Sequence, residues 1–259
     1  METLIVERTA GVVTVTMNRP EKKNAANGAM FDELMATFIE VERNAEDRVL
    51  VLTGAGGAFC TGADLSDTEG PLDPSKPGML RMRRLNDSAM ALHRLSKPAI
   101  AKVEGLAVGA GLSLALGCDL VVASETARFS LIFARRGLSL DFGSSWLLPR
   151  LIGLAKAKEL ALFGDIIGAD DALAMGLVNR VVPPGQLDAF VDDWAARLAA
   201  GPPLALAATK ALLNGSLETS MAEALEDEGR CQAYNFTTED TNEALAAFIA
   251  KREPKFTGR

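Results

Sequence analysis

The hydrophobic pattern predicts that the chain begins with strands and a helix. Apolar residues alternate with threonines over residues 12–17, and Gly11 joins this segment tightly to an earlier apolar run over residues 3–9. A period of two is typical of strands, so we expect two neighbouring strands here. Apolar residues at helical spacing over 28–43, preceded by Asn27, predict a helix with a side-chain cap. Further short strands are expected over residues 49–53, 98–103 and 120–123.

The order of these elements predicts an α/β core followed by a helical region. A loop over 105–111 and a short helix over 112–117 lie between two of the expected strands. Strand–loop–helix–strand order favours parallel units with right-handed crossovers. From about residue 142 the pattern is mostly helical, with the last helices expected over 186–200, 204–214, 221–234 and 240–252. We therefore expect a core over residues 1–200 and a helical, oligomerising region over 201–259.

Composition excludes several classes of function. The chain has 259 residues, 48% hydrophobic residues and a net charge of -7, without a basic run, which argues against nucleic-acid binding. Its longest nearly uncharged stretch, 105–118, is too short to span a membrane, and its first apolar run, 4–6, is too short for a signal peptide. Three cysteines without paired spacing support neither a disulfide framework nor a zinc site. We expect a cytoplasmic protein with no metal and no membrane or nucleic-acid partner.

Two glycine-rich loops are the first candidates for chemistry. The segments 58–65 and 105–111 each follow a strand, and the second opens a helix. Small residues let a backbone approach a ligand closely, and helix N-termini carry unpaired N–H groups. Two such groups converging on one carbonyl oxygen would form an oxyanion hole. The alternative is that these glycines only permit tight turns and close helix–sheet packing.

The order of several short motifs identifies a family. These motifs are Asn18-Arg19-Pro20, Asn24-Ala25, residues 59–65, Lys97-Pro98, Gly109-Ala110-Gly111, Cys118-Asp119-Leu120 and Gly176-Leu177-Val178. Together they resemble the enoyl-CoA hydratase/isomerase, or crotonase, family over nearly the whole chain. The resemblance implies a crotonase-like spiral of ββα units and a homotrimer or dimer of trimers. It also implies an acyl-CoA substrate whose coenzyme A is part of the substrate, with no separate cofactor. The oxyanion donors then fall on the backbone N–H groups of Ala63 and Ala110.

The acidic residues separate isomerisation from hydration. Hydratases of the family use two glutamates, whose positions fall on Ser113 and Phe133, and neither residue is a useful base near neutral pH. Asp141 lies among Leu, Phe and Trp residues, where desolvation should raise its pKa into the range of a general acid/base. The alternative role for Asp141 is an N-cap of the helix that starts near residue 142.

Residues 138–150 and 254–259 are similar to the phenylacetate-pathway isomerases of this family, whose catalytic aspartate falls on Asp141. The expected function is an acyl-CoA isomerase that shifts a C=C bond, from 3-enoyl-CoA to 2-enoyl-CoA, or converts ring-epoxide phenylacetyl-CoA to oxepin-CoA. Two alternatives stay open. One is a hydratase with a different pair, such as Asp67 and Asp141, and the other is a non-catalytic acyl-CoA-binding protein.

Further residues are candidates for substrate binding or for shaping the pocket. Lys22 and Lys251 are expected near the coenzyme A phosphates, Phe248 against the adenine, and Asp64 in the first loop, where it fixes the loop conformation. The remaining candidates are Leu65, Gly109, Ser113, Phe133 and Trp146. The only histidine, His93, is expected to have a packing or surface role. Prolines over 70–78 predict a mobile surface loop.

Overall fold

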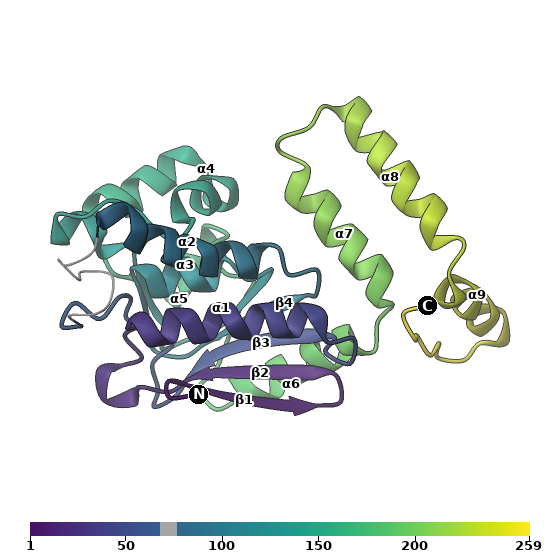
Figure 1. Ribbon diagram of the computed structural model, residues 1–259, viewed down its shortest axis with the longest axis horizontal. Helices are drawn as coiled ribbons and strands as arrows, with labels where there is room; N and C mark the ends of the chain where they lie inside the picture. Colours follow the sequence, from purple (N-terminus) through teal and green to yellow (C-terminus); the bar gives the residue numbers. More distant parts are fainter. Residues whose placement is uncertain (68–76) are drawn as a thin grey trace.

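The computed structural model describes residues 1–67 and 77–259. They form an α/β core, shown on the left of Figure 1, and a group of C-terminal helices on the right. The proline-rich loop predicted over 70–78 lies outside the described residues, except for its last two positions.

A six-stranded sheet forms the centre of the core. Its strands are β1 (Leu4–Thr9), β2 (Val12–Met17), β3 (Val49–Gly54), β4 (Ala99–Val103), β6 (Leu120–Ser124) and β9 (Arg180–Val182), and they lie in the order β1-β2-β3-β4-β6-β9. The strands β1 and β2 pair antiparallel through the turn at Gly11, and every later pairing is parallel. A second sheet has the order β5-β7-β8, with β5 (Leu106–Val108), β7 (Arg128–Ser130) and β8 (Ile167–Gly168).

The helices that follow the strands cover the core. They are α1 (Gly28–Arg43), α2 (Gly78–His93), α3 (Ala110–Leu116), α4 (Ser144–Phe163), α5 (Ala169–Ala174) and α6 (Leu187–Ala199), with short 3-10 turns η1 (Pro20–Lys22) and η2 (Ile132–Arg136). The Asn27 side chain accepts a hydrogen bond from the Met30 N–H at 3.0 Å, which confirms the predicted cap of α1.

Both faces of the large sheet are covered, and β3 shows how. Leu50 and Leu52 belong to the main core under α1, α2 and α3, whereas Val49 and Val51 belong to a second cluster against α6. Successive side chains of a strand point to opposite faces, so a strand buried on both faces is apolar throughout. This explains the continuous apolar run of β3.

The second glycine-rich loop differs from its prediction. A loop was expected over 105–111 and a helix over 112–117, but the loop contains β5 and the helix α3 begins two residues earlier, at Ala110. A three-residue strand is too short to show a period of two. The earlier helix start follows from Gly109, whose φ of 56° only glycine adopts readily and which turns the chain into α3.

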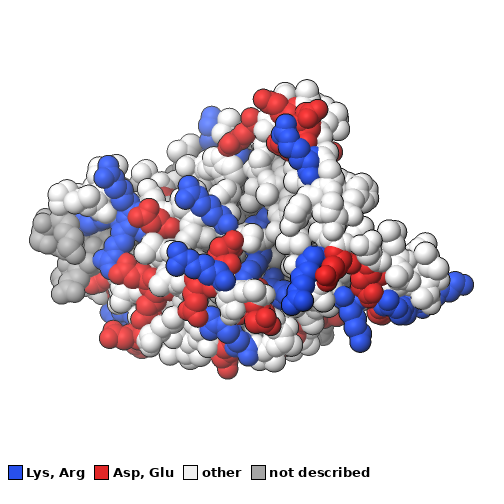
Figure 2. Space-filling view, turned by 45° about the vertical axis from the view of Figure 1, so that its right-hand side comes forward, with Lys and Arg blue, Asp and Glu red and all other residues white. Residues whose placement is uncertain are grey.

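The C-terminal helices extend away from the core. In Figure 1, α7 (Pro203–Gly215) and α8 (Met221–Asn235) run side by side in opposite directions, and α9 (Glu239–Ala250) lies beside the C-terminus. Within the described chain, no residue of α7 or α8 is buried. Figure 2 shows charged residues of both signs over the core and at the ends of the projecting part, with uncharged surface between those ends. No described helix is both long and apolar enough to cross a membrane.

Candidate active site

In the first predicted oxyanion loop, the Ala63 N–H points away from Ala26, the residue that binds the loop. The Ala26 N–H donates to the Gly62 carbonyl at 2.7 Å, and the Asp64 N–H donates to the Ala26 carbonyl at 2.8 Å. The C=O and N–H of a trans peptide unit point in opposite directions. Because the Gly62 carbonyl points at Ala26, the Ala63 N–H of the same peptide unit points away from it.

The second loop meets the first at this peptide. Ala110 is the first residue of α3, so its N–H has no acceptor within the helix. A Cβ atom at Gly62 would lie 3.0 Å from the Val108 carbonyl oxygen and 3.4 Å from the Ala110 nitrogen. A Cβ at Gly111 would lie only 2.2 Å from the Cys60 carbonyl oxygen, so the two loops touch through their glycines. The structure thus brings together the two backbone segments predicted to supply the oxyanion donors.

Ser113 and Phe133 both lie beside Gly109 of the second loop. The buried Ser113 hydroxyl donates to the Gly109 carbonyl at 3.2 Å. The Phe133 ring comes within 3.9 Å of the position that a Gly109 Cβ would take. A hydroxyl and an aromatic ring therefore stand next to the loop where the resemblance places the glutamates of hydratases.

Asp141 lies in the connection between η2 and α4. The Leu138 N–H of this connection donates to the Phe133 carbonyl at 3.0 Å, which ties it to the surroundings of the second loop. Among the residues that the structure describes, the buried Oδ1 of Asp141 has no hydrogen-bond partner. Burial raises the pKa of Asp141 to about 6. A carboxylate with such a pKa both accepts and returns a proton near neutral pH.

The alternative role of Asp141 as a helix cap is wrong. Helix α4 begins at Ser144, its cap residue is Gly143, and no side chain accepts a hydrogen bond at this cap. Among the described residues, the helix start contacts Asp141 through its main-chain carbonyl, which accepts from the Ser144 N–H at 3.0 Å and from the Ser144 hydroxyl at 2.8 Å. The carboxylate itself is therefore left for another role.

Asp64 and Asp67, at the end of the first loop, both accept hydrogen bonds from other residues. Asp64 is buried and pairs with Arg19 at 3.0 Å. Burial opposes its ionisation, but hydrogen bonds from Ser66 and the Arg19 guanidinium together lower the pKa of Asp64. The Asp67 carboxylate accepts from the Gly28 N–H at 2.9 Å, at the start of α1. Sequence reasoning did not find Arg19 as the partner of Asp64, because nothing in the spacing of 45 residues indicates it.

Lys22 and Leu65 lie at the exposed edge of the first loop. The Lys22 ammonium group donates to the Ser66 hydroxyl at 3.3 Å, so a cation stands beside this loop. Leu65 leaves about half of its side chain in solvent. Substrate binding by these two residues stays a prediction.

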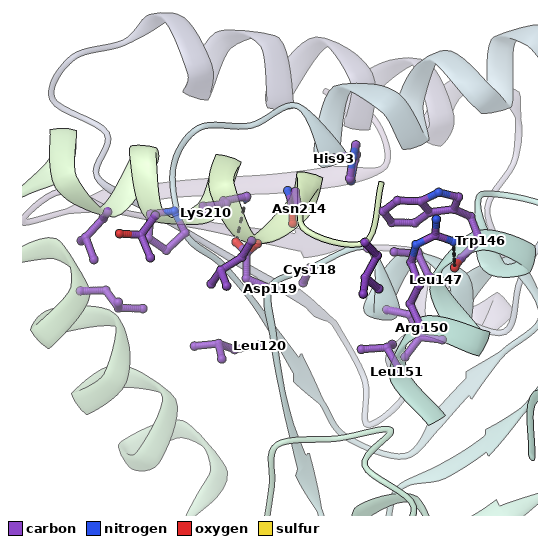
Figure 3. A pocket seen from close by; sticks show the side chains of 18 residues that line it. His93, Cys118, Asp119, Leu120, Trp146, Leu147, Arg150, Leu151, Lys210 and Asn214 are labelled. Atoms are coloured by element: carbon purple, nitrogen blue, oxygen red, sulfur yellow. Dashed lines mark hydrogen bonds and ion pairs between the residues drawn. The ribbon is translucent and has the colours of Figure 1, made fainter. Parts of the chain in front are cut away.

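Trp146 lines a cavity of about 450 Å³ together with residues of α3, α4 and α7 (Figure 3). Its role as a wall of the acyl pocket with Phe133 stays a prediction. This cavity includes Leu116 and Gly117 at the far end of α3, and its described lining does not include Ala63, Ala110 or Asp141. His93 packs edge-on against Trp146, with ring centroids 5.3 Å apart. Trp146 also donates from Nε1 to Glu218 at 3.1 Å and lies under Arg150.

Phe248 and Lys251 are not brought to the loops within one chain. Phe248 is 83% exposed on α9, and Lys251 follows at the C-cap with a φ of 50°. In Figure 1, α9 lies at the right edge of the molecule, far from α3. Within one chain these two residues do not approach the loops, so the predicted contacts to coenzyme A require a second chain.

Known proteins are similar to this chain over nearly its whole length. The family model described as enoyl-CoA hydratase/isomerase matches residues 7–259. The chain is 38% identical to 1,2-epoxyphenylacetyl-CoA isomerase of Escherichia coli (strain K12), covering 100% of both chains. It is 35% identical to the short-chain-enoyl-CoA hydratase of Clostridium acetobutylicum, covering 98% of this chain and 97% of that one.

A solved structure has the same fold. The crystal structure of an enoyl-CoA hydratase from Mycobacterium smegmatis superposes with a TM-score of 0.91 at 36% identity, covering 98% of each chain. The match confirms the crotonase-like fold that the motifs implied. The protein with these two touching loops and this spiral α/β core therefore belongs to the enoyl-CoA hydratase/isomerase family.

Proposed function

We propose that this enzyme is an acyl-CoA isomerase in which Asp141 carries the proton. The observation that carries this proposal is the buried Oδ1 of Asp141, which has no hydrogen-bond partner among the described residues and belongs to a group with a pKa of about 6. A buried carboxylate without a partner is unfavourable for folding and is common at functional sites.

The loops and Asp141 together provide the parts of an isomerisation. The N–H groups of Ala63 and Ala110 bind the thioester carbonyl oxygen. Asp141 removes a proton from the carbon between the alkene and this carbonyl, and the electron pair spreads over the resulting dienolate, whose oxygen the two N–H groups stabilise. Asp141 then returns the proton at the far end of the dienolate. One double bond moves into conjugation, and no atom is gained or lost.

Two candidate substrates follow from this chemistry. The first is a 3-enoyl-CoA, which becomes the conjugated 2-enoyl-CoA. The second is a ring-epoxide phenylacetyl-CoA, which the likeness to the Escherichia coli isomerase favours because that enzyme is named for this substrate. In both cases the carbon next to the thioester carbonyl loses the proton and a more distant carbon gains it. In the ring epoxide, the C–C bond shared by the epoxide and the six-membered ring also breaks, which expands the ring to the oxepin.

The two alternatives receive less support. Hydration through Asp67 and Asp141 would need Asp67 to bind a water, but the Asp67 carboxylate already accepts from the N-terminus of α1. A non-catalytic acyl-CoA carrier would have no use for a carboxylate whose burial raises its pKa to about 6.

The C-terminal helices carry the surface that would form the homotrimer or dimer of trimers implied by the family resemblance. Phe248 and Ile249 are 83% and 81% exposed, and Phe236 and Leu217 are exposed as well. Apolar surface of this extent is typical of a protein interface. We propose that residues 201–259 pack against neighbouring copies, and that Phe248 and Lys251 reach the coenzyme A bound to a neighbour.

The test uses two ultraviolet assays on the purified enzyme. Conversion of a 3-enoyl-CoA to the conjugated 2-enoyl thioester raises the absorbance, whereas hydration of a 2-enoyl-CoA lowers it. The proposal predicts the rise with the first substrate and no fall with the second. A fall without a rise would identify a hydratase, and binding of both substrates without either change would identify a carrier.

A further inference from the structure

Residues 19–26 hold the first oxyanion loop along its whole length. The fully buried Asn24 donates from its side-chain amide to the carbonyls of Ala55 at 2.8 Å and Ala58 at 2.7 Å. The Asn24 side-chain oxygen in turn accepts from the Arg19 N–H at 2.9 Å. Farther along, Ala26 binds the residues on either side of Ala63. The loop that carries Ala63 is thus attached to residues 19–26 at both its start and its end.

The Arg19 side chain binds both the first loop and the segment 19–26 that holds it. Its Nη2 lies 3.0 Å from Oδ2 of Asp64, the residue after Ala63. Its Nη1 donates to the carbonyl of Ala25, the residue before Ala26. Only 16% of the Arg19 side chain and 8% of the Asp64 side chain are exposed. A guanidinium is a rigid, planar donor, so it fixes the relative positions of the two groups it binds.

This geometry controls the direction of the Ala63 N–H. The peptide between Gly62 and Ala63 is oriented by the hydrogen bond from Ala26, and Asp64 is held by Ala26 and Arg19. Gly62 has a φ of +94°, a conformation that glycine adopts freely, so the backbone alone does not fix this peptide. The orientation of this peptide is therefore set by contacts with the surrounding residues, and the Arg19 side chain connects two of these residues, Ala25 and Asp64.

We propose that Arg19 is a positioning residue that, through Asp64 and Ala25, aims the Ala63 N–H at the thioester carbonyl of the substrate. This inference rests on the proposed function, because it assumes that Ala63 is an oxyanion donor. Arg19 does not touch the substrate in this account. Its removal takes away the ion pair of the Asp64 carboxylate and the side-chain hydrogen bond to Ala25, and leaves the Gly62–Ala63 peptide oriented by its main-chain contacts with Ala26.

The experiment measures how strongly the protein polarises a bound carbonyl. A saturated acyl-CoA labelled with ¹³C at the thioester carbonyl is bound to wild type, Arg19→Met and Arg19→Lys, and its carbonyl band is followed by isotope-edited infrared spectroscopy. Arg8→Met is the matched control. Arg8 also pairs with a buried aspartate, Asp47, at 3.3 Å, but Arg8 lies on β1 and not in the segment that holds the first loop. Steady-state kinetics are measured on the same four proteins.

Relative to free ligand, the proposal predicts that the carbonyl band moves to lower frequency in the complexes of wild type and Arg8→Met. In the Arg19→Met complex the band should move less. Losing one oxyanion donor lowers rates on the order of 10²–10³, so a misaligned donor should lower kcat roughly 10- to 100-fold, with a smaller change in KM. Arg19→Lys keeps one contact at a time and should lie between the two.

Two outcomes separate the possible failures. Equal band displacement in wild type and Arg19→Met would overturn the role of Arg19 and leave the proposed function standing. A wild-type complex without any displacement would remove the oxyanion hole itself, and with it the basis of the proposed function. If Arg19→Met does not fold, Arg19→Lys and Asp64→Asn carry the same comparison, and the band of each must move back toward that of free ligand.

Discussion

Replacing Asp141 by Asn should stabilise the protein relative to wild type, and this stabilisation should be larger at pH 8 than at pH 4. Burial raises the pKa of Asp141 from its ordinary value of 3.8 to about 6. The folded state therefore binds this proton more tightly than the unfolded state. The contribution of Asp141 to stability is fully present below about pH 4 and is lost as the pH rises through about 6, because the buried carboxylate must then ionise. Asparagine has nearly the same shape and no charge to lose.

The magnitude follows from the shift in pKa. A tenfold change in an equilibrium corresponds to about 1.4 kcal/mol, so ionisation of Asp141 should cost up to about 3 kcal/mol of stability. The side chain is partly exposed, and the unfolded state already ionises in part at pH 4. We therefore expect the difference between Asp141→Asn and wild type to change by about 2 kcal/mol from pH 4 to pH 8.

Urea unfolding at the two pH values and one fixed protein concentration measures this change. The buried amide of asparagine has its own desolvation cost, but that cost is the same at both pH values and cancels. Asp64→Asn is the control of opposite sign, because the pKa of Asp64 is lowered and its charge stabilises the fold above its ordinary pKa. A pH-independent difference between Asp141→Asn and wild type would refute the burial argument.

Three further predictions concern activity and assembly. The kcat/KM for isomerisation should rise with pH through about 6 and then level off, because Asp141 must be ionised to remove the proton; a flat profile from pH 5 to 8 would contradict this. Gly62→Ala should lower kcat at least 10-fold and reduce thioester carbonyl polarisation, since its Cβ would lie 3.0 Å from the Val108 oxygen at a φ of +94°. Phe248→Asp should shift sedimentation from trimer or hexamer toward monomer, and an unchanged sedimentation coefficient would exclude α9 from the interface.

The sequence predicted the parts of the fold that show a clear period or a cap. The alternation over 12–17 and the helix over 28–43 with Asn27 before it were confirmed as β2 and α1. The strands β5, β7 and β8 escaped prediction because two or three residues contain no measurable period, and their pairing depends on segments far apart in the chain. Residue spacing alone does not reveal such pairing.

The candidate site also contains residues that local sequence predicts and residues whose position depends on distant parts of the chain. Asp141 could be found from its apolar neighbours, because burial of a carboxylate follows from what surrounds it. The contact between the loops also followed from their glycines. Trp146 could not be placed, because its side chain turns from the start of α4 toward His93 and Glu218, and Glu218 lies 72 residues later in the chain. Arg19 was visible as a motif residue, but its role depends on a pairing that only the folded chain reveals.

The isomerisation rate of Asp141→Asn tests the central claim most directly. Wild type and variant are compared with a 3-enoyl-CoA by the rise in absorbance of the conjugated thioester, and acyl-CoA binding is measured on both. If Asp141 carries the proton, the variant should bind acyl-CoA as wild type does and lose roughly 10²- to 10⁴-fold in kcat. A variant that isomerises at the wild-type rate would contradict the account and assign the proton transfer to another group.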